Sequence, residues 1–278
     1  MIKTNYHTHT TFCDGKNTVS EMAAEAVKRK FDILGFSSHS MGKFSDPWHL
    51  RVEEHAEYAA EVRRVADEMR GKLCVQLGFE VDYIRGLCSP NREDFAEFKP
   101  DYIIGAVHFV MNENGCFAVD DARENVQNGI DKFFGGDKRA VVHSYFENER
   151  EMLAKGGFDI IAHADLVRKH NSSLALFDEE SAEYKDELKL TAKAIQKAGV
   201  IAEVNTGAMA RGYLSVPYPS PYFLSLLFEL GVPVTFSADA HAAENLDFGY
   251  DAALAHIKNA GYKEIAYLES STVKFQKL

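Results

Sequence analysis

The sequence is poor in features that mark secreted and membrane proteins. Its 278 residues contain four cysteines, Cys13, Cys74, Cys88 and Cys116, and no Cys-x-x-Cys pair. This scarcity argues against a disulfide framework or a thiolate zinc site and is typical of reduced thiols, which predicts a cytoplasmic protein. No apolar run approaches the roughly 18 residues of a membrane span. Met1-Ile2-Lys3 leads directly into a strand-like run, so we expect neither a signal peptide nor a membrane partner.

Basic residues are also scarce, with 31 Lys and Arg against 42 Asp and Glu and a net charge of −11. A protein that binds nucleic-acid polymers needs a basic stripe to neutralise phosphates, so this balance argues against such a partner. It does not exclude a small anionic substrate, because bound divalent cations override the global charge locally. The composition leaves the oligomeric state open.

Short strand-like runs are plentiful, and seven of them end at a residue that can bind a metal or a polar ligand. In chain order, these end residues are His7-Thr8-His9, His39, Glu80, His108, His163, Asn205 and Asp239-Ala240-His241. Apolar runs of this length between helical patterns are typical of buried strands in a parallel sheet. The carboxyl ends of such strands form the ligand site in barrels and open α/β sheets. A single histidine at a strand end means little, but seven such ends predict one shared site.

Helical patterns separate the strands and carry recognisable end signals. Thr18-Val19-Ser20-Glu21 predicts a capping box at the start of a helix, and Ser220-Pro221 predicts another helix start. We expect helices from Thr18 to about Lys30, over 50–70, 122–134, 137–155 and 178–198, from Ser220 to about Leu230, and over 250–260. Residues 264–268 are expected to add a terminal strand without chemistry. No repeat or linker is visible, so we predict one domain over residues 1–278, with right-handed parallel α/β crossovers.

Nine candidate metal ligands lie at or near the strand ends: His7, His9, Asp14, His39, Glu80, His108, His163, Asp239 and His241. Most of them, taken singly, would more often be a satisfied polar residue, and Asp14 would be an ordinary turn residue. Residues two apart on a strand face the same side, so His7 and His9 can meet one cation. Nine ligands exceed the four that one zinc ion takes, which predicts two or three divalent transition metals, Zn, Mn or Fe. The histidines that follow no strand, His49, His55, His143 and His256, are predicted to be surface or packing residues.

The order and placement of these motifs resemble the PHP superfamily of phosphoesterases, from His7 to Ser237-Ala238-Asp239-Ala240-His241. The resemblance implies a distorted, TIM-like (β/α)7 barrel with a trinuclear metal site at the C-terminal ends of its strands. By family role, His7, His9, Glu80 and Asp239 would hold the first metal, and Glu80 would bridge to a second metal held by His108 and His163. Asp14, His39 and His241 would hold the third.

Within the superfamily, the chain is similar to the histidinol-phosphate phosphatase branch. This similarity rests on Val167-Arg168, on Glu203-Val204-Asn205-Thr206 leading to Arg211, and on Tyr218-Pro219-Ser220-Pro221. It implies that Arg168 and Arg211 bind the substrate phosphate, which a guanidinium fork can grip bidentately.

These features together predict a hydrolase of small phosphate monoesters, with L-histidinol phosphate as the favoured substrate in histidine biosynthesis. A hydroxide shared by two metals would attack phosphorus in line with the ester bond. Asp239 and His241 are the candidate catalytic residues, and Asp239 would orient the hydroxide and accept its proton. The alternatives are a PHP-type phosphoesterase for nucleotides or other small phosphate esters, and a metal-binding barrel without activity.

Overall fold

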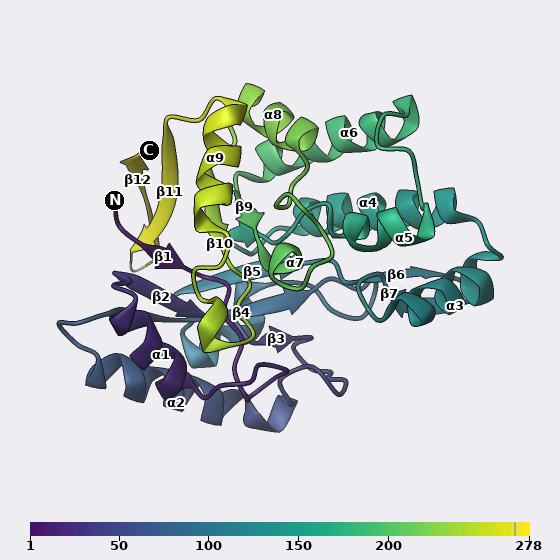
Figure 1. Cartoon of the computed structure of the whole chain (residues 1–278). Helices are drawn as coiled ribbons and strands as arrows, with labels where there is room; N and C mark the ends of the chain where they lie inside the picture. Colours follow the sequence, from purple (N-terminus) through teal and green to yellow (C-terminus); the bar gives the residue numbers. More distant parts are fainter. Residues whose placement is uncertain (270) are drawn as a thin grey trace.

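The computed structural model describes residues 1–269 and 271–278, in which strands and helices alternate along the chain (Figure 1). The strands are β1 Thr4–Asn5, β2 Ile33–Phe36, β3 His39–Ser40, β4 Cys74–Asp82, β5 Tyr102–Ala106, β6 Phe109–Asn112, β7 Gly115–Ala118, β8 Ile160–Ile161, β9 Ile201–Asn205, β10 Val234–Ser237, β11 Glu264–Glu269 and β12 Thr272–Lys277. The α-helices are α1 Val19–Lys28, α2 His55–Glu68, α3 Arg123–Phe134, α4 Lys138–Lys155, α5 Asn171–Leu174, α6 Ala182–Ala198, α7 Gly207–Ala210, α8 Pro221–Glu229 and α9 Tyr250–Ala260. Short 3-10 helices cover Val52–Glu54, Arg92–Phe98, Leu166–His170 and Ala243–Asn245.

Seven of these strands form a parallel sheet in the order β1-β2-β4-β5-β8-β9-β10. The first and last strands then meet, because Thr8 pairs in parallel with Ala240. The His9 amide donates to the Ala240 carbonyl at 2.9 Å, and the Ala240 amide donates to the His7 carbonyl at 3.1 Å. The sheet is therefore a nearly closed seven-stranded barrel, as predicted, with its helices outside the strands (Figure 1).

The predicted helices are present, with shifts at several of their ends. Thr18 and Glu21 form the expected reciprocal capping box of α1, and the Ser220 side chain caps α8 with Pro221 in its first turn. The helix expected from residue 50 starts as a 3-10 turn, and α2 begins only at His55. The helix expected from residue 178 begins at Ala182, because Asp178 closes a turn in front of the Ser181 cap.

Large side chains fill the interior of the barrel. Tyr6 and Tyr102 are fully buried there and meet edge-to-face with their ring centroids 5.6 Å apart. Gly35 and Gly78 leave the room for Tyr102, since a Cβ at either position would lie within 2.4 Å of its ring or hydroxyl. The Tyr102 hydroxyl donates to the Tyr6 and Phe36 carbonyls at 2.5 and 3.1 Å. This packed layer is typical of small barrels, whose interior is core rather than pore.

Two antiparallel hairpins extend the barrel. The expected terminal strand is present as β11, and it pairs with a second strand, β12, that the sequence analysis did not predict. Ala266 and Leu268 of β11 belong to the buried barrel cluster, and the Leu268 amide and carbonyl both bond to the Tyr6 hydroxyl. The β6–β7 hairpin, which directly follows β5 and His108, was also not predicted. Over the described residues, no helix is both long enough and apolar enough to span a membrane.

Candidate metal centre

The nine candidate ligands come together at the carboxyl ends of the barrel strands. Atoms able to bind a metal lie within 4.8 Å of one another in four overlapping groups. The groups are His9, Asp14, His39 and His241; His7, His9 and Asp239; His7, Glu80 and His163; and His39, Glu80 and His108. Residues separated by more than 230 positions therefore share one cluster, because the barrel brings its first and last strands side by side.

Glu80 occupies the middle of this cluster and has no solvent exposure. One of its oxygens, Oε2, lies 2.7 Å from His39 Nδ1 and 3.0 Å from His7 Nε2. The other, Oε1, lies 3.1 Å from His163 Nε2 and 3.6 Å from His108 Nε2. The two oxygens thus face different histidine pairs, which is the arrangement a bridging carboxylate needs.

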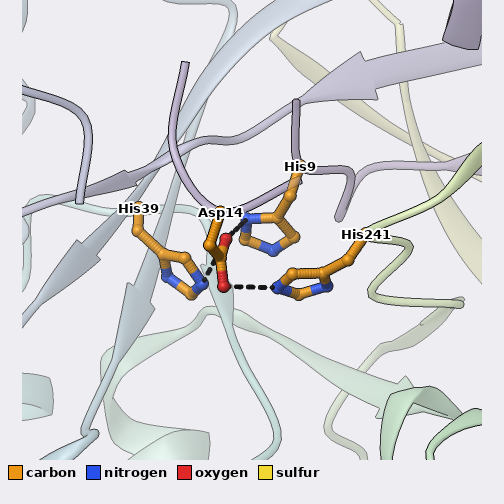
Figure 2. A group of neighbouring side chains, drawn as sticks. All are labelled: His9, Asp14, His39 and His241. Atoms are coloured by element: carbon orange, nitrogen blue, oxygen red, sulfur yellow. Dashed lines mark ion pairs between the residues drawn. The ribbon is translucent and has the colours of Figure 1, made fainter. Parts of the chain in front are cut away.

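The Asp14 carboxylate lies among three imidazoles, as Figure 2 shows. Its carboxylate lies 3.2 Å from His241 Nε2, 3.8 Å from His39 Nε2 and 3.9 Å from His9 Nδ1. The turn that presents Asp14 requires the glycine that follows, because a Cβ on Gly15 would lie 2.5 Å from the Thr10 backbone nitrogen. Asp14 is the most exposed carboxylate of the cluster, at 35% for its side chain.

Asp239, two residues beyond the end of β10, is the third carboxylate of the cluster. Its Oδ1 lies 3.3 Å from His9 Nε2 and 3.8 Å from His7 Nε2, and its Oδ2 accepts from Arg211 Nη2 at 3.0 Å. The Asp239 backbone adopts φ +50°, a left-handed conformation that is uncommon for a residue with a Cβ and that clusters at functional sites.

The donor set fits transition metals. Four of its buried atoms, His7 Nε2, His9 Nε2, His39 Nδ1 and Glu80 Oε2, make no hydrogen bond of acceptable angle in the part of the chain that the structure describes, although Glu80 Oε2 lies close to two of the imidazoles. Buried polar atoms without partners are rare in native proteins and point to an absent ion or water. Six imidazoles with three carboxylates suit zinc, iron or manganese better than calcium or magnesium.

Two further carboxylates, which the sequence analysis did not identify as site residues, orient two of the histidines. They contact the ring nitrogen that faces away from the cluster. His7 Nδ1 lies 2.8 Å from Glu203 Oε1, and His108 Nδ1 lies 2.8 Å from Asp82 Oδ1. Each contact turns the Nε2 atom of its histidine toward the cluster, as in the carboxylate–histidine pairs behind most metal-binding histidines. A sequence signal was present for Asp82, which follows Glu80 by two positions and so lies on the same face of β4.

The prediction for His49 needs correction. Of the two predicted alternatives, surface or packing, the surface one is wrong, because the His49 side chain is fully buried in the segment before α2. His49 Nε2 lies 2.7 Å from Asp82 Oδ2, so Asp82 joins His49 to His108. Of the other histidines, His143 is exposed and pairs with Glu187, whereas His55 packs against phenylalanines.

The electrostatics of the cluster favour bound positive charge. Burial alone would raise the pKa of Glu80, but His7, His39 and His108 outweigh it and hold that pKa well below its usual range. Burial would lower the pKa of His108, yet Asp82 and Glu80 raise it to about 10. Burial and the neighbouring imidazoles of His241 and His39 hold the pKa of His9 well below its usual value. The ionised Glu80 and the neutral His9 are in the protonation states that metal binding requires, whereas His108 would have to release its proton when a metal binds.

The two predicted substrate arginines have different positions. Arg211 lines a cavity of about 500 Å³ beside the cluster, together with Asp14, His39, Asp239 and His241. Arg168 is 5% exposed, and its guanidinium lies 3.6 Å from Asp165 and 3.2 Å from Glu179. It is not among the described residues that line this cavity, although the adjacent Lys169 is. Arg211 therefore lies on the cavity wall, whereas Arg168 is buried in contacts with Asp165 and Glu179.

The fold and the site together identify the class of protein. Residues 5–207 match the PHP domain, so the chain belongs to the PHP domain family. This match covers seven of the nine candidate ligands and ends before Asp239 and His241.

Relatives within the family match nearly the whole chain. The chain is 27% identical to the histidinol-phosphatase of Bacillus subtilis, over 91% of this chain and 99% of that protein. It is 28% identical to a probable histidinol-phosphatase of Deinococcus radiodurans, over 94% of this chain and 95% of that protein. The crystal structure of histidinol phosphate phosphatase from Lactococcus lactis, complexed with zinc, L-histidinol and phosphate, has the same fold. It superposes with a TM-score of 0.76 at 19% identity, over 98% of this chain and 99% of that one.

Proposed function

We propose that the protein is a metal-dependent phosphatase that hydrolyses L-histidinol phosphate to L-histidinol and phosphate in histidine biosynthesis. The observation that carries the proposal is the convergence of nine imidazole and carboxylate side chains on one cluster beside a cavity. The choice of substrate is supported by relatives with this activity in their names that match over nine-tenths of the chain.

Two or three ions would be shared among the nine residues. His7, His9, Glu80 and Asp239 would hold the first ion, and Glu80 would also reach the second through its other oxygen. His108 and His163 would complete the second site, and Asp14, His39 and His241 would form the third. Bound divalent transition ions would supply a nucleophile by lowering the pKa of water, and they would neutralise the phosphate oxygens.

The remaining steps fall to side chains of the protein. Arg211 would donate to a free phosphate oxygen from its position on the cavity wall, and its bond to Asp239 Oδ2 keeps the guanidinium aimed there. Asp239, which faces both the cluster and Arg211, would accept the proton of the attacking water, and His241 Nδ1 lies 3.4 Å from its Oδ1. Arg168 would also bind the phosphate, which would require its guanidinium to turn away from Glu179.

A phosphate-release assay with a small panel of phosphate esters tests the proposal. The metal-loaded protein is given L-histidinol phosphate, several nucleotides, an aryl phosphate and a bis-nitrophenyl diester. We expect monoesters to be strongly favoured, because a diester has one negative charge fewer and a bulky group where Arg211 should bind. L-Histidinol phosphate should have the highest kcat/KM. A preference for nucleotides or diesters would overturn the assignment, and absence of turnover with every ester would leave a metal-binding barrel without phosphatase activity.

A further inference from the structure

Trp48 lies on the cavity wall next to the metal centre, and it is the only tryptophan in the chain. Its indole meets two candidate ligands edge-on. The ring centroids are 4.7 Å from His39 and 5.4 Å from His108, with interplanar angles of 86° and 83°. His49 and Phe109 pack against the indole at smaller angles, 36° and 16°. A large half-buried aromatic ring is thus part of the same cavity as Arg211 and Asp14.

Polar contacts fix the segment that carries this indole. Asp46 Oδ1 accepts from the Trp48 amide at 3.3 Å and lies 2.7 Å from His49 Nδ1. His49 Nε2 in turn lies 2.7 Å from the buried Asp82. One residue further on, the Leu50 amide donates to the His39 carbonyl at 2.9 Å. Trp48 therefore directly precedes two residues, His49 and Leu50, that contact strands of the metal centre, although it lies outside the regular elements.

This arrangement differs from ordinary packing of an aromatic side chain. Phe44, in the same segment, is 43% exposed and is not among the described residues that line this cavity. Trp48 borders the cavity, and its position is set by the Asp46–His49–Asp82 contacts described above. Cavities of this size bind small molecules through an aromatic wall and a few polar groups that fix orientation. The phosphate end is accounted for by Arg211 and the ligand cluster, which leaves the alcohol end to the remaining wall.

We propose that Trp48 is a specificity-determining residue that recognises the planar ring on the alcohol portion of the substrate, with His49 as the positioning residue that holds it. This inference rests on the proposed function, and it identifies the contact that selects L-histidinol phosphate among small phosphate monoesters. The imidazole ring packs against the indole while the phosphate lies at the metal centre. Such aromatic pairs contribute beyond the area that they bury and prefer offset or edge-to-face geometry.

Two substrates that differ only by the imidazolylmethyl group test the proposal. Phosphoethanolamine has the aminoethyl phosphate portion of L-histidinol phosphate without the imidazolylmethyl group. We expect Trp48→Ala to lower the ratio of kcat/KM for L-histidinol phosphate over phosphoethanolamine by about 2- to 13-fold, the range for an aromatic pair. Trp48→Phe, which keeps a ring, should lower the ratio less. Phe44→Ala is the matched control in the same segment and should leave the ratio unchanged.

Fluorescence provides a second readout that does not depend on turnover. Because Trp48 is the sole tryptophan, adding L-histidinol to the metal-loaded wild-type protein should change its tryptophan emission saturably, and adding ethanolamine should change it much less. His49→Gln should shift the emission to the red and increase quenching by acrylamide, because the ring that packs against the indole and contacts both Asp46 and Asp82 would be lost. Metal content is measured for every variant.

The possible failures are distinguishable. An unchanged substrate ratio in Trp48→Ala, equal losses on both substrates, or no emission change with L-histidinol would each overturn the role of Trp48, even if the protein hydrolyses L-histidinol phosphate well. Absence of turnover of both substrates by the wild-type protein would instead refute the proposed function, and this inference would fail with it.

Discussion

Replacing Glu203 with glutamine tests how the protein prepares its metal ligands. The buried Glu203 carboxylate accepts from three directions. Its Oε1 faces His7 Nδ1 at 2.8 Å, and its Oε2 accepts from the His163 amide at 3.1 Å and from Asn205 Nδ2 at 2.9 Å. Glutamine has nearly the same shape but only one accepting oxygen, so it cannot satisfy both sides.

The size of the effect on metal binding depends on which neighbour of residue 203 loses its hydrogen-bond acceptor. If the glutamine oxygen serves the His163 amide and Asn205, its NH2 group faces His7 Nδ1, and His7 must carry its proton on Nε2. That proton then occupies the position from which Nε2 would bind a metal. If the amide turns the other way, two buried donors lose their acceptor at about 1–3 kcal/mol each. Loss of such an orienting carboxylate typically weakens metal binding 10- to 100-fold, or about 1.4–2.7 kcal/mol.

The assay is a competition titration with a chelator of known affinity, followed by phosphate release at saturating metal. Glu187→Gln is the matched control, because Glu187 also lies against a histidine, with its Oε1 2.6 Å from His143 Nδ1, but outside the metal centre. We expect Glu203→Gln to weaken metal binding by the stated factor and Glu187→Gln to leave it unchanged. Full metal affinity in Glu203→Gln would refute the reasoning, since Glu203 would then not control the orientation of His7.

Further predictions concern the arginines and the stability at low pH. Arg211→Ala should retain metal but lose kcat/KM for L-histidinol phosphate by about 10- to 150-fold, measured by phosphate release, and full activity would remove Arg211 from the substrate site. Arg168→Ala should lower the free energy of unfolding by about 3–5 kcal/mol in denaturant titrations, because the buried Asp165 carboxylate would lose the guanidinium that it faces. Burial lowers the pKa of His55 from 6.5 to about 4. Between these values the unfolded state binds a proton that the folded state does not, so stability should fall as pH drops from about 6.5 to 4, by up to about 3 kcal/mol. His55→Leu should flatten this part of the stability profile, and an unchanged slope would contradict the assignment.

Much of the fold could be predicted because its pattern is local. The apolar runs and the capping signals at Thr18 and Ser220 lie within a few residues of the features they define. Parallel strands then require their carboxyl ends to meet at one edge, which is why single residues such as Glu80 and His163 could be assigned to one site. The β6–β7 hairpin escaped prediction because its strands are short and half-exposed, so their alternation is weak.

The outer parts of the site could not be predicted in the same way, because they depend on contacts between distant segments. His49 follows no strand, and its role becomes visible only when Asp82, 33 positions later, is placed against it. Arg168 and Lys169 are adjacent in sequence, yet a short 3-10 helix directs only the second toward the cavity. The direction of a side chain in an irregular segment has no periodicity from which it could be read.

The measurement that tests the central claim most directly is the metal content of the purified protein. After loading with zinc or manganese and removal of free ions, elemental analysis should find two or three ions per chain. Glu80→Ala should lose more metal than Asp14→Ala, because only Glu80 faces two groups of histidines. A stoichiometry of one ion or fewer in the wild-type protein would contradict the account of nine side chains arranged around a multinuclear centre.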